Sequence, residues 1–581
     1  MPSLLMLLAT TALAAPAVDA PDATEPTEES DMAEEEAPLL PDPDGDDPYQ
    51  WLEEVMGEKP LAQVEAWNQA TLEEMNADPR FAEMQAVALK ALTSDARLTT
   101  GNIKGKDLYN FWQSPDHVRG IWRRTPLSAW LDGSPEWEVL LDVDALAAAE
   151  SENWIWHGAF CAPKSDRCLV ELSRGGKDAA VVREFDRGTK AFVDGGFFLP
   201  EAKSSVHMLD EDTVLLGTDT GEGSLTTSGY PRHVTLWTRG SAPEEAELLL
   251  SAEETDMVAA GYALHHGKAA RTLISKRQSF YEQSLYLRSD DGELAELPLP
   301  KRFSVHGLYG DHLVVLLEQD WSHDGTDYAE GQLVSLHLDE GTAATLYAPA
   351  EGEAIQEVHI GKKSVFVSTL ADVVGELWRL KPGKGGWAKE QVDLPDNGQV
   401  SIAGGADDRD DLLVTFESLT QPVTLYYVDK KDAVRELQSL PSFFEPGDIV
   451  VEQRFATSTD GTKVPYFLMA KKSVLEEGSA PTIQYGYGGF QASILPTYFR
   501  DRARPQQGAF AGPLWVQDGG VLVLSNIRGG GEYGPAWHAA ALVHDRQKAY
   551  DDFFAIGEQL VADGVTTPGQ LGAIGRSNGG L

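Results

Sequence analysis

The last eleven residues of the chain, LGAIGRSNGGL (571–581), run from a short apolar segment into a glycine-rich turn with one serine. Gly575, Ser577 and Gly579 match the G-x-S-x-G pattern, in which a nucleophilic serine lies on a sharp turn between a strand and a helix. The apolar run supplies the strand, and the small neighbours let chain and helix approach closely. The stretch therefore predicts a nucleophilic Ser577 at the carboxyl end of a sheet strand.

Upstream segments continue an alternation of strand and helix from about residue 448. APTIQYGYGGF (480–490) predicts a strand entering a glycine-rich loop, and GGVLVLSNIRGGGEYG (519–534) predicts a second buried strand. Residues 545–564 follow with a helical pattern. This spacing indicates a parallel, doubly wound sheet, so we expect an α/β domain over 448–581.

A different pattern occupies residues 96–447. Short runs rich in Val, Leu, Thr and Tyr alternate with Gly, Asp and Ser clusters, as in CLVELSRGG (168–176) and HLVVLLEQD (312–320). About 350 residues of such strands suit a β-propeller, and blades of roughly 45–50 residues fit seven times. A pair of β-sandwiches is the alternative. We expect no substantial helix in this region, and two or more helices within 120–430 would argue against the propeller.

The N-terminal region predicts an export signal, a linker and a helical segment. Residues 1–15 contain the apolar run of a signal peptide, although no Lys or Arg precedes Lys59. Residues 16–47 are acidic and rich in Pro, Ala and Thr, which predicts a disordered linker. Residues 48–95 show helical periodicity. We expect a periplasmic or secreted protein without a lipid anchor; if the start is misassigned or the apolar run is only a tail, it is cytoplasmic.

Composition narrows the function classes. Asp and Glu number 92 against 47 Lys and Arg, a net charge of −45, so the chain lacks the positive charge that nucleic-acid binding requires. The 13 His and two Cys show no metal-ligand spacing, and we expect neither metal nor cofactor. Cys161 and Cys168 flank a turn-like segment and are either disulfide-bonded or two buried thiols.

Four motifs in order resemble the prolyl oligopeptidase family of serine peptidases: YGYGGF (485–490), SNIRGGGEYG (525–534), AWHAAALVHDRQKAYDDF (536–553) and GRSNGG (575–580). DDPYQWLEEV (46–55) and the REFD and GGFFLPEAKSSV stretches (183–206) fit its bacterial members. The resemblance implies a multidomain fold: a seven-bladed β-propeller capping an α/β-hydrolase domain, with the N-terminal helical segment packed on the latter. It also implies a monomer that cleaves short peptides after proline without a cofactor.

Carried onto this chain, the resemblance assigns four residues. Ser577 is the acylated nucleophile, Asn578 donates its backbone N–H to the oxyanion, and the Tyr487 hydroxyl is the second donor. Phe490 lines the pocket for the residue before the scissile bond. From the residues alone, Tyr487 also fits a packing tyrosine at a strand end, and Phe490 also fits ordinary core.

The catalytic acid and base are expected elsewhere. α/β-Hydrolases order their triad Ser, Asp, His, so both partners are expected after residue 581. His538 and His544 precede the serine and are assigned structural roles, as is the Arg528–Glu532 run, whose two charges we expect to pair. The chain is thus expected to be an inactive fragment of an active serine oligopeptidase. The alternatives are an oligopeptidase or esterase of other specificity, and a propeller-containing binding protein with a vestigial hydrolase half.

Overall fold

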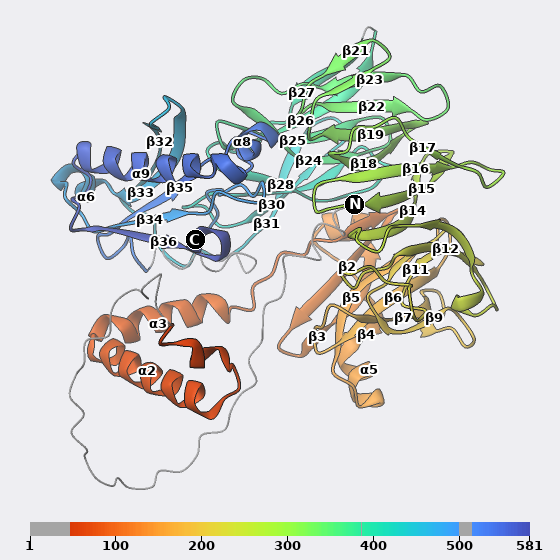
Figure 1. Cartoon of the computed structure of the whole chain (residues 1–581), viewed down its shortest axis with the longest axis horizontal. Helices are drawn as coiled ribbons and strands as arrows, with labels where there is room; N and C mark the ends of the chain where they lie inside the picture. The colour runs from red at the N-terminus through yellow and green to blue at the C-terminus, as the bar shows by residue number, and fades with distance from the viewer. Residues whose placement is uncertain (1–46, 385, 499–513) are drawn as a thin grey trace. The chain divides into compact units, whose positions relative to one another are not determined.

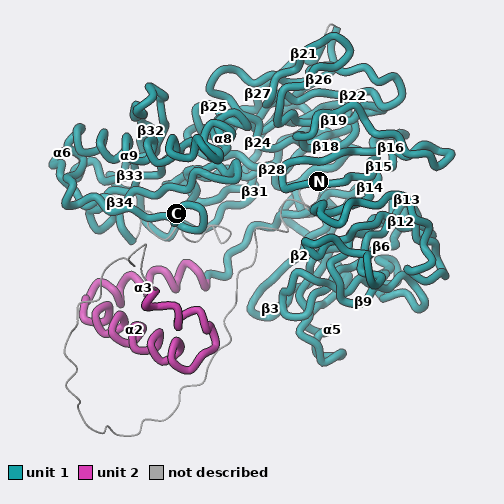
Figure 2. The backbone as a smooth tube through the Cα atoms, viewed as in Figure 1, with its two compact units in different colours: residues 1–9, 94–581 teal, residues 10–93 magenta. Residues whose placement is uncertain are grey.

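The computed structural model describes residues 47–384, 386–498 and 514–581. The predicted signal peptide (1–15) and, apart from Asp47, the predicted linker (16–47) lie outside the described residues. Contact clustering divides the described chain into two compact units between Thr93 and Ser94 (Figure 2). Within the described ranges, no helix is both long and apolar enough to cross a membrane.

The N-terminal unit is helical. It contains η1 (Gln50–Glu53), α2 (Glu58–Ala77) and α3 (Pro79–Leu92). Between the two longer helices, Asp78 accepts a hydrogen bond from the Arg80 N–H and caps α3, whose first residue is proline. The periodic apolar residues that predict α2 remain 42–53% exposed in this unit: Leu61, Val64, Trp67, Leu72 and Met75. Their packing on the hydrolase domain stays a prediction.

Seven antiparallel sheets follow one another along residues 102–439 (Figure 1). The first three are β1 (Asn102–Lys104), β2 (Asp107–Ser114), β3 (His117–Pro126) and β4 (Glu138–Asp142); β5 (Trp154–Cys161), β6 (Arg167–Arg174), β7 (Ala180–Asp186), β8 (Ala191–Phe192) and β9 (Phe198–Ala202); and β10 (Ser205–Met208), β11 (Thr213–Gly217), β12 (His233–Thr238) and β13 (Glu247–Ser251). The second sheet has five strands because β8 and β9 both pair with β7.

The remaining four sheets keep the four-stranded plan. They are β14 (Val258–His266), β15 (Ala269–Arg277), β16 (Gln283–Arg288) and β17 (Leu294–Glu296); β18 (Phe303–Tyr309), β19 (His312–Leu317), β22 (Leu333–His337) and β23 (Ala343–Tyr347); β24 (Glu353–Ile360), β25 (Val365–Ala371), β26 (Val374–Gly383) and β27 (Gly386–Gln391); and β28 (Gln399–Gly405), β29 (Leu412–Glu417), β30 (Thr424–Val428) and β31 (Val434–Ser439). A hairpin of β20 (Trp321–His323) and β21 (Thr326–Tyr328) is inserted in the fifth.

The sheets are the blades of a propeller because the first strands of blades 2 to 7 contact one another in succession, β3 of blade 1 contacts β5 of blade 2, and β28 of the last blade contacts β1 of the first. At the closure, the Thr99 N–H donates to Gln438 Oε1 at 2.8 Å. A Cβ on Gly404 would lie 2.4 Å from the Gly101 carbonyl oxygen, so the two backbones touch. The ring therefore closes by packing between complete blades, and the seven-bladed propeller is confirmed while the sandwich alternative is wrong.

One expectation about this region is wrong. Two short helices, α4 (Leu127–Leu131) and α5 (Val143–Glu150), lie within 120–430, together with the 3₁₀ turn η2 (Pro243–Glu245). Both helices follow strands of blade 1 and occupy connections rather than strand positions. Asp142 caps α5 by accepting from the Ala145 N–H. Two short helices in the connections are therefore compatible with a propeller, and the expectation that they would exclude it was wrong.

The two cysteines face each other across the β5–β6 hairpin. Cys161 and Cys168 are register partners with Cα atoms 3.8 Å apart, and the structure joins them in a disulfide. The free-thiol alternative is therefore not what the structure shows. The bond itself leaves the export of the protein untested.

The C-terminal sheet has the order β32 (Ile449–Thr457), β33 (Lys463–Lys471), β35 (Val521–Ser525), β34 (Thr482–Gly486) and β36 (Leu571–Gly575). β33 is antiparallel to both β32 and β35, whereas β34 is parallel to β35 and to β36. The sheet is thus mixed, not wholly parallel as predicted, because a tight turn makes β32 and β33 a hairpin. The crossover from β34 to β35 and the helix before β36 make the later strands parallel.

Helices border this sheet. They are α6 (Lys472–Glu477), α8 (Pro535–Ala539), α9 (Gln547–Ala562) and the short turns η3 (Val543–Asp545) and η4 (Ser577–Gly580). α9 lies along the sheet (Figure 1) and buries Ile556 and Leu560 in a core shared with β33 and β35. Phe554, on the same helix, is 60% exposed.

Candidate active site

Ser577 lies on a strained turn directly after β36. Its φ of +54° is in the left-handed region, which a residue with a side chain rarely adopts. A Cβ on Gly575 would lie 1.7 Å from the Gly579 carbonyl oxygen, and one on Gly579 would lie 2.3 Å from the Gly486 carbonyl oxygen. Only glycine fits at both flanking positions. The side chain of Ser577 is exposed, as a nucleophile on such a turn requires.

The loop after β34 lies beside this turn because β34 and β36 are parallel neighbours, with Gly486 opposite Gly575. The Asn578 side-chain amide donates to the Tyr487 carbonyl oxygen at 2.7 Å. A Cβ on Gly489 would lie 2.3 Å from Asn578 Nδ2. The structure thus brings together the two residues predicted to form the oxyanion hole, Tyr487 and Asn578.

Phe490 ends the same loop and does not belong to the core. It is 56% exposed, has a φ of +53°, and meets the Phe280 ring edge-on at 6.2 Å. It borders a cavity of about 500 Å³ between propeller blades and hydrolase loops. Other lining residues include Tyr281, Glu318, Gln356 and Tyr533, while Ser577 is not among them. The exposed position favours the pocket interpretation of Phe490 over the core one.

A buried ion-pair network fixes the strand exit after β35. Arg528 is 4% exposed, and its guanidinium contacts both oxygens of the fully buried Asp552 at 2.6 and 2.9 Å. It also reaches Asp460 in the β32–β33 turn at 2.5 Å. Hydrogen bonding to Asp552 raises the pKa of Arg528, and hydrogen bonding to Arg528 lowers that of Asp460. The network ties α9 to two loops of the sheet.

The expected pairing of Arg528 with Glu532 is therefore wrong, since α9 supplies the partner. Glu532 is 1% exposed and accepts hydrogen bonds from the Ile494 N–H at 2.8 Å and the Asn526 amide at 3.4 Å. Burial raises the pKa of Glu532 to about 7, although these hydrogen bonds act in the opposite direction. Its role is in the packing of the loop after β35.

The two histidines before the serine do not serve it as a base in this structure. His538 is 1% exposed, and its Nδ1–H donates to the Gly529 carbonyl oxygen at 2.7 Å. Burial lowers the pKa of His538, which keeps the ring neutral. His544 is exposed on η3. In the part of the chain that the structure describes, no hydrogen bond joins an imidazole to the Ser577 hydroxyl.

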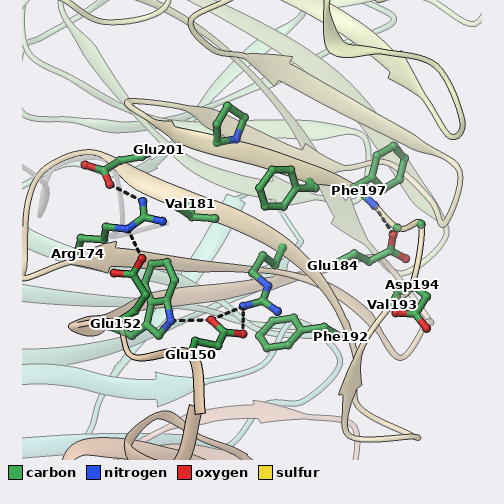
Figure 3. A pocket seen from close by; sticks show the side chains of 16 residues that line it. Glu150, Glu152, Arg174, Val181, Glu184, Phe192, Val193, Asp194, Phe197 and Glu201 are labelled. Atoms are coloured by element: carbon green, nitrogen blue, oxygen red, sulfur yellow. Dashed lines mark hydrogen bonds and ion pairs between the residues drawn. The ribbon is translucent and has the colours of Figure 1, made fainter. Parts of the chain in front are cut away.

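A second cavity, of about 700 Å³, lies on blade 2 and contains none of the predicted catalytic residues (Figure 3). Its charged side chains already pair: Arg174 contacts Glu152 at 3.1 Å and Glu201 at 2.6 Å, and Arg183 contacts Glu150 at 2.8 Å. This leaves little unpaired charge to attract a ligand.

One histidine–carboxylate grouping also occurs on blade 1, formed by His117, Asp142 and Asp144. Its carboxylates have other partners, because Asp142 caps α5 and Asp144 accepts from the backbone N–H groups of Arg119 and Gly120. It carries no metal assignment.

Sequence reasoning missed the contributions of the propeller to this site. Phe280 and Tyr281 come from the turn between β15 and β16, more than 200 residues before the hydrolase residues that they contact. Nothing in the local sequence marks this turn. Only the tertiary structure brings it to Phe490 and His538.

Comparison with known proteins agrees with this arrangement. Residues 29–439 match the prolyl oligopeptidase N-terminal β-propeller domain, and residues 510–581 match the prolyl oligopeptidase family. An uncharacterized peptidase of Sinorhizobium fredii is 37% identical over 93% of this chain and 75% of its own length. A prolyl endopeptidase of Elizabethkingia meningoseptica is 25% identical over 92% of this chain and 73% of its own.

A solved structure extends the likeness to the fold. A post-proline cleaving enzyme of Rickettsia typhi superimposes with a TM-score of 0.80 at 29% identity, covering 92% of this chain and 79% of that enzyme. The propeller match spans more than half of this chain. The strained turn that carries Ser577 lies within the residues that match the prolyl oligopeptidase family, 510–581. The chain therefore belongs to the prolyl oligopeptidase family of serine peptidases.

Proposed function

We propose that this protein is an oligopeptidase that cleaves short peptides on the carboxyl side of proline through an acyl-enzyme on Ser577. The observation that carries the proposal is the left-handed Ser577 on the turn after β36, with glycines on both sides where no Cβ fits. Such a turn exposes the hydroxyl at the edge of the sheet. The post-proline specificity is supported by the Rickettsia typhi enzyme and the Elizabethkingia prolyl endopeptidase.

In this proposal the loop after β34 and the turn after β36 each supply one donor of the oxyanion hole, and the loop also supplies part of the specificity pocket. The Asn578 N–H and the Tyr487 hydroxyl stabilise the developing negative charge. Phe490 packs against the proline ring. Exposed aromatic surface beside a cavity suits this apolar ring.

We also propose that the 581-residue chain does not turn over substrate by itself. A serine hydroxyl needs a base to take its proton, and none of the histidines in the described ranges is hydrogen-bonded to Ser577. Without base and acid, only about a thousand-fold acceleration remains from the oxyanion hole and binding.

The test compares two proteins on three substrates. The proteins are the 581-residue chain and the same reading frame continued through any codons that follow residue 581. The substrates are chromogenic peptides with proline or arginine before the scissile bond and a short-chain ester. We expect the extended protein alone to cleave, with the proline peptide preferred, and Ser577→Ala to abolish cleavage.

Other outcomes select the alternatives. Preference for arginine or for the ester would replace the post-proline assignment by another serine hydrolase activity. Peptide binding without cleavage by either protein would indicate a binding protein. Cleavage by the 581-residue chain that depends on Ser577 would show that a histidine of this chain, His538 or His544, reaches the serine.

We further propose that the protein acts in the periplasm or outside the cell. The proposal rests on the apolar run within residues 1–15. Its test is cell fractionation of the full chain; retention in the cytoplasm with the N-terminus uncleaved would favour the cytoplasmic alternative.

A further inference from the structure

The turn between β15 and β16 carries two aromatic residues of the propeller onto the hydrolase loops. The Phe280 ring meets Phe490 edge-on at 6.2 Å, and the Tyr281 ring lies 5.4 Å from the His538 ring at an interplanar angle of 42°. Phe280 and Tyr281 also pack on each other at 5.0 Å. The two rings thus form a direct contact between blade 4 and the loops beside the predicted active site.

This turn is held within its own blade. The Ser279 hydroxyl oxygen accepts from the N–H groups of Tyr281 at 3.3 Å and Glu282 at 3.1 Å. The Arg302 guanidinium lies 5.7 Å from the centre of the Tyr281 ring. These contacts hold the backbone of the turn and place a guanidinium beside the Tyr281 ring without any hydrolase residue.

His538, on the other side of the contact, joins two hydrolase loops. Its Nδ1 lies 2.7 Å from the Gly529 oxygen and 3.2 Å from the Gln491 nitrogen. One ring nitrogen cannot donate and accept at once, so Nδ1–H donates to Gly529 and the Gln491 N–H turns to the same carbonyl, 3.3 Å away. His538 thereby holds the Gly529 carbonyl, and this carbonyl in turn accepts the Gln491 N–H at the end of the Tyr487–Gln491 loop.

On the Nε2 side of the imidazole, packing rather than a hydrogen bond holds the ring in place. His538 Nε2 is buried and has no hydrogen-bond partner among the residues that the structure describes. The Tyr281 ring lies against the imidazole instead. Removal of that ring would free His538 to turn and to release the Gly529 carbonyl, which is the acceptor of the Gln491 N–H.

The pKa of Tyr281 reflects burial and the groups around it. Burial raises the pKa of Tyr281, Arg302 opposes this rise, and Glu318 and Tyr487 add to it. Tyr281 lines the same cavity as Phe490 and Gln491, which end the loop that carries Tyr487.

We propose that Tyr281 is a positioning residue that acts through His538 to hold the Tyr487–Gln491 loop in the conformation the reaction needs. The inference rests on the proposed function in one respect, the role of Tyr487 as oxyanion donor. In this proposal, the contact between blade 4 and His538 orders the loop that carries Tyr487 and Phe490.

Amide hydrogen exchange of the 581-residue chain, followed by mass spectrometry, tests this without any turnover. We expect Tyr281→Ala to speed exchange in residues 486–492 by about tenfold or more, because loop opening sets the rate of exchange. Exchange in β35 (521–525) is expected to stay unchanged. Tyr281→Phe, which keeps the ring, is expected to behave like the unmodified chain.

Two further variants make the test specific. Tyr230→Ala, in a blade 3 loop where the hydroxyl contacts Asp178, serves as a matched control and is expected to leave 486–492 unchanged. His538→Ala should speed exchange in the loop, and adding Tyr281→Ala should then have no further effect.

Three results would overturn the proposal: unchanged exchange in Tyr281→Ala, an equal rise in β35, or additive effects of the two substitutions. The first would show that Tyr281 does not hold the loop. The second would show a general loss of stability, and the third would show that Tyr281 does not act through His538. A failure of post-proline cleavage would leave these exchange results standing, so the two proposals fail separately.

Discussion

Ser577 adopts a backbone conformation that costs stability, and its neighbours force it to do so. At a φ of +54° a residue with a Cβ is destabilised by roughly 1–2 kcal/mol relative to glycine. We therefore expect Ser577→Gly to raise the free energy of unfolding by about 1 kcal/mol, while Ser577→Ala leaves it nearly unchanged. Urea denaturation of the three proteins measures this. Equal stability of the Gly and Ala variants would show that the turn is relaxed in solution.

Asp552 carries a larger stability effect, because it neutralises a buried guanidinium. Truncation would leave Arg528, which is 4% exposed, with only the partly exposed Asp460 as a charged partner. We expect Asp552→Ala to lower the free energy of unfolding by roughly 3–5 kcal/mol, as for other broken buried pairs. Glu558→Ala, exposed on the same helix, is the control and should change it by less than about 0.5 kcal/mol. A small effect of Asp552→Ala would mean that Asp460 alone compensates the charge.

At the scale of elements, the β5–β6 hairpin is cross-linked by Cys161–Cys168, which are seven residues apart. A loop this short predicts a stabilisation of about 2–3 kcal/mol from the restricted unfolded chain. We expect the Cys161→Ser/Cys168→Ser double variant to unfold at lower urea concentration, and reductant to shift the parent to the same midpoint. A thiol titration of the unfolded, unreduced protein that finds two free thiols would show that the bond does not form.

Elements with a local signature were predictable, and those without one were not. The alternation of strand and turn identified the propeller. The glycines around Ser577 identified the nucleophile turn, because a turn this tight requires glycine at fixed positions within five residues. α4 spans only five residues, too few for a helical period to appear. The partner of Arg528 lies 24 residues away on α9 rather than four residues away, since packing of that helix decides which acid is buried.

At the scale of the whole molecule, contacts between residues far apart in the sequence determine which loops and blades are neighbours. Ring closure joins Gly101 to Gly404, and Tyr281 meets His538 across more than 250 residues. No periodicity reports such contacts. This is why Ser577 and the three candidate residues around it could be named from the sequence, whereas the propeller residues beside them could not.

The propeller also concentrates histidines on the first strands of blades 2 to 7, which contact one another in succession. His207 lies on β10, His306 on β18 and His359 on β24. Burial lowers the pKa of each of these imidazoles from 6.5 to about 4. The neighbouring His265 contributes to the shift at His207, and a hydrogen bond from the imidazole to the Ala406 backbone opposes it at His359.

These shifts predict acid sensitivity of the propeller with a defined sign and pH window. The unfolded chain protonates these histidines near pH 6.5, whereas the folded chain does so only near pH 4, so the unfolded state binds more protons in between. Their contribution to stability is complete above about pH 6.5 and is lost as the pH falls to about 4, by roughly 1–3 kcal/mol per histidine. Urea denaturation at steps between pH 7.5 and 4 should show this loss, and His306→Gln should reduce its slope. His233→Gln, on the third strand of blade 3, is the matched control; a slope that changes equally in both variants would show that the acid response does not come from the first strands.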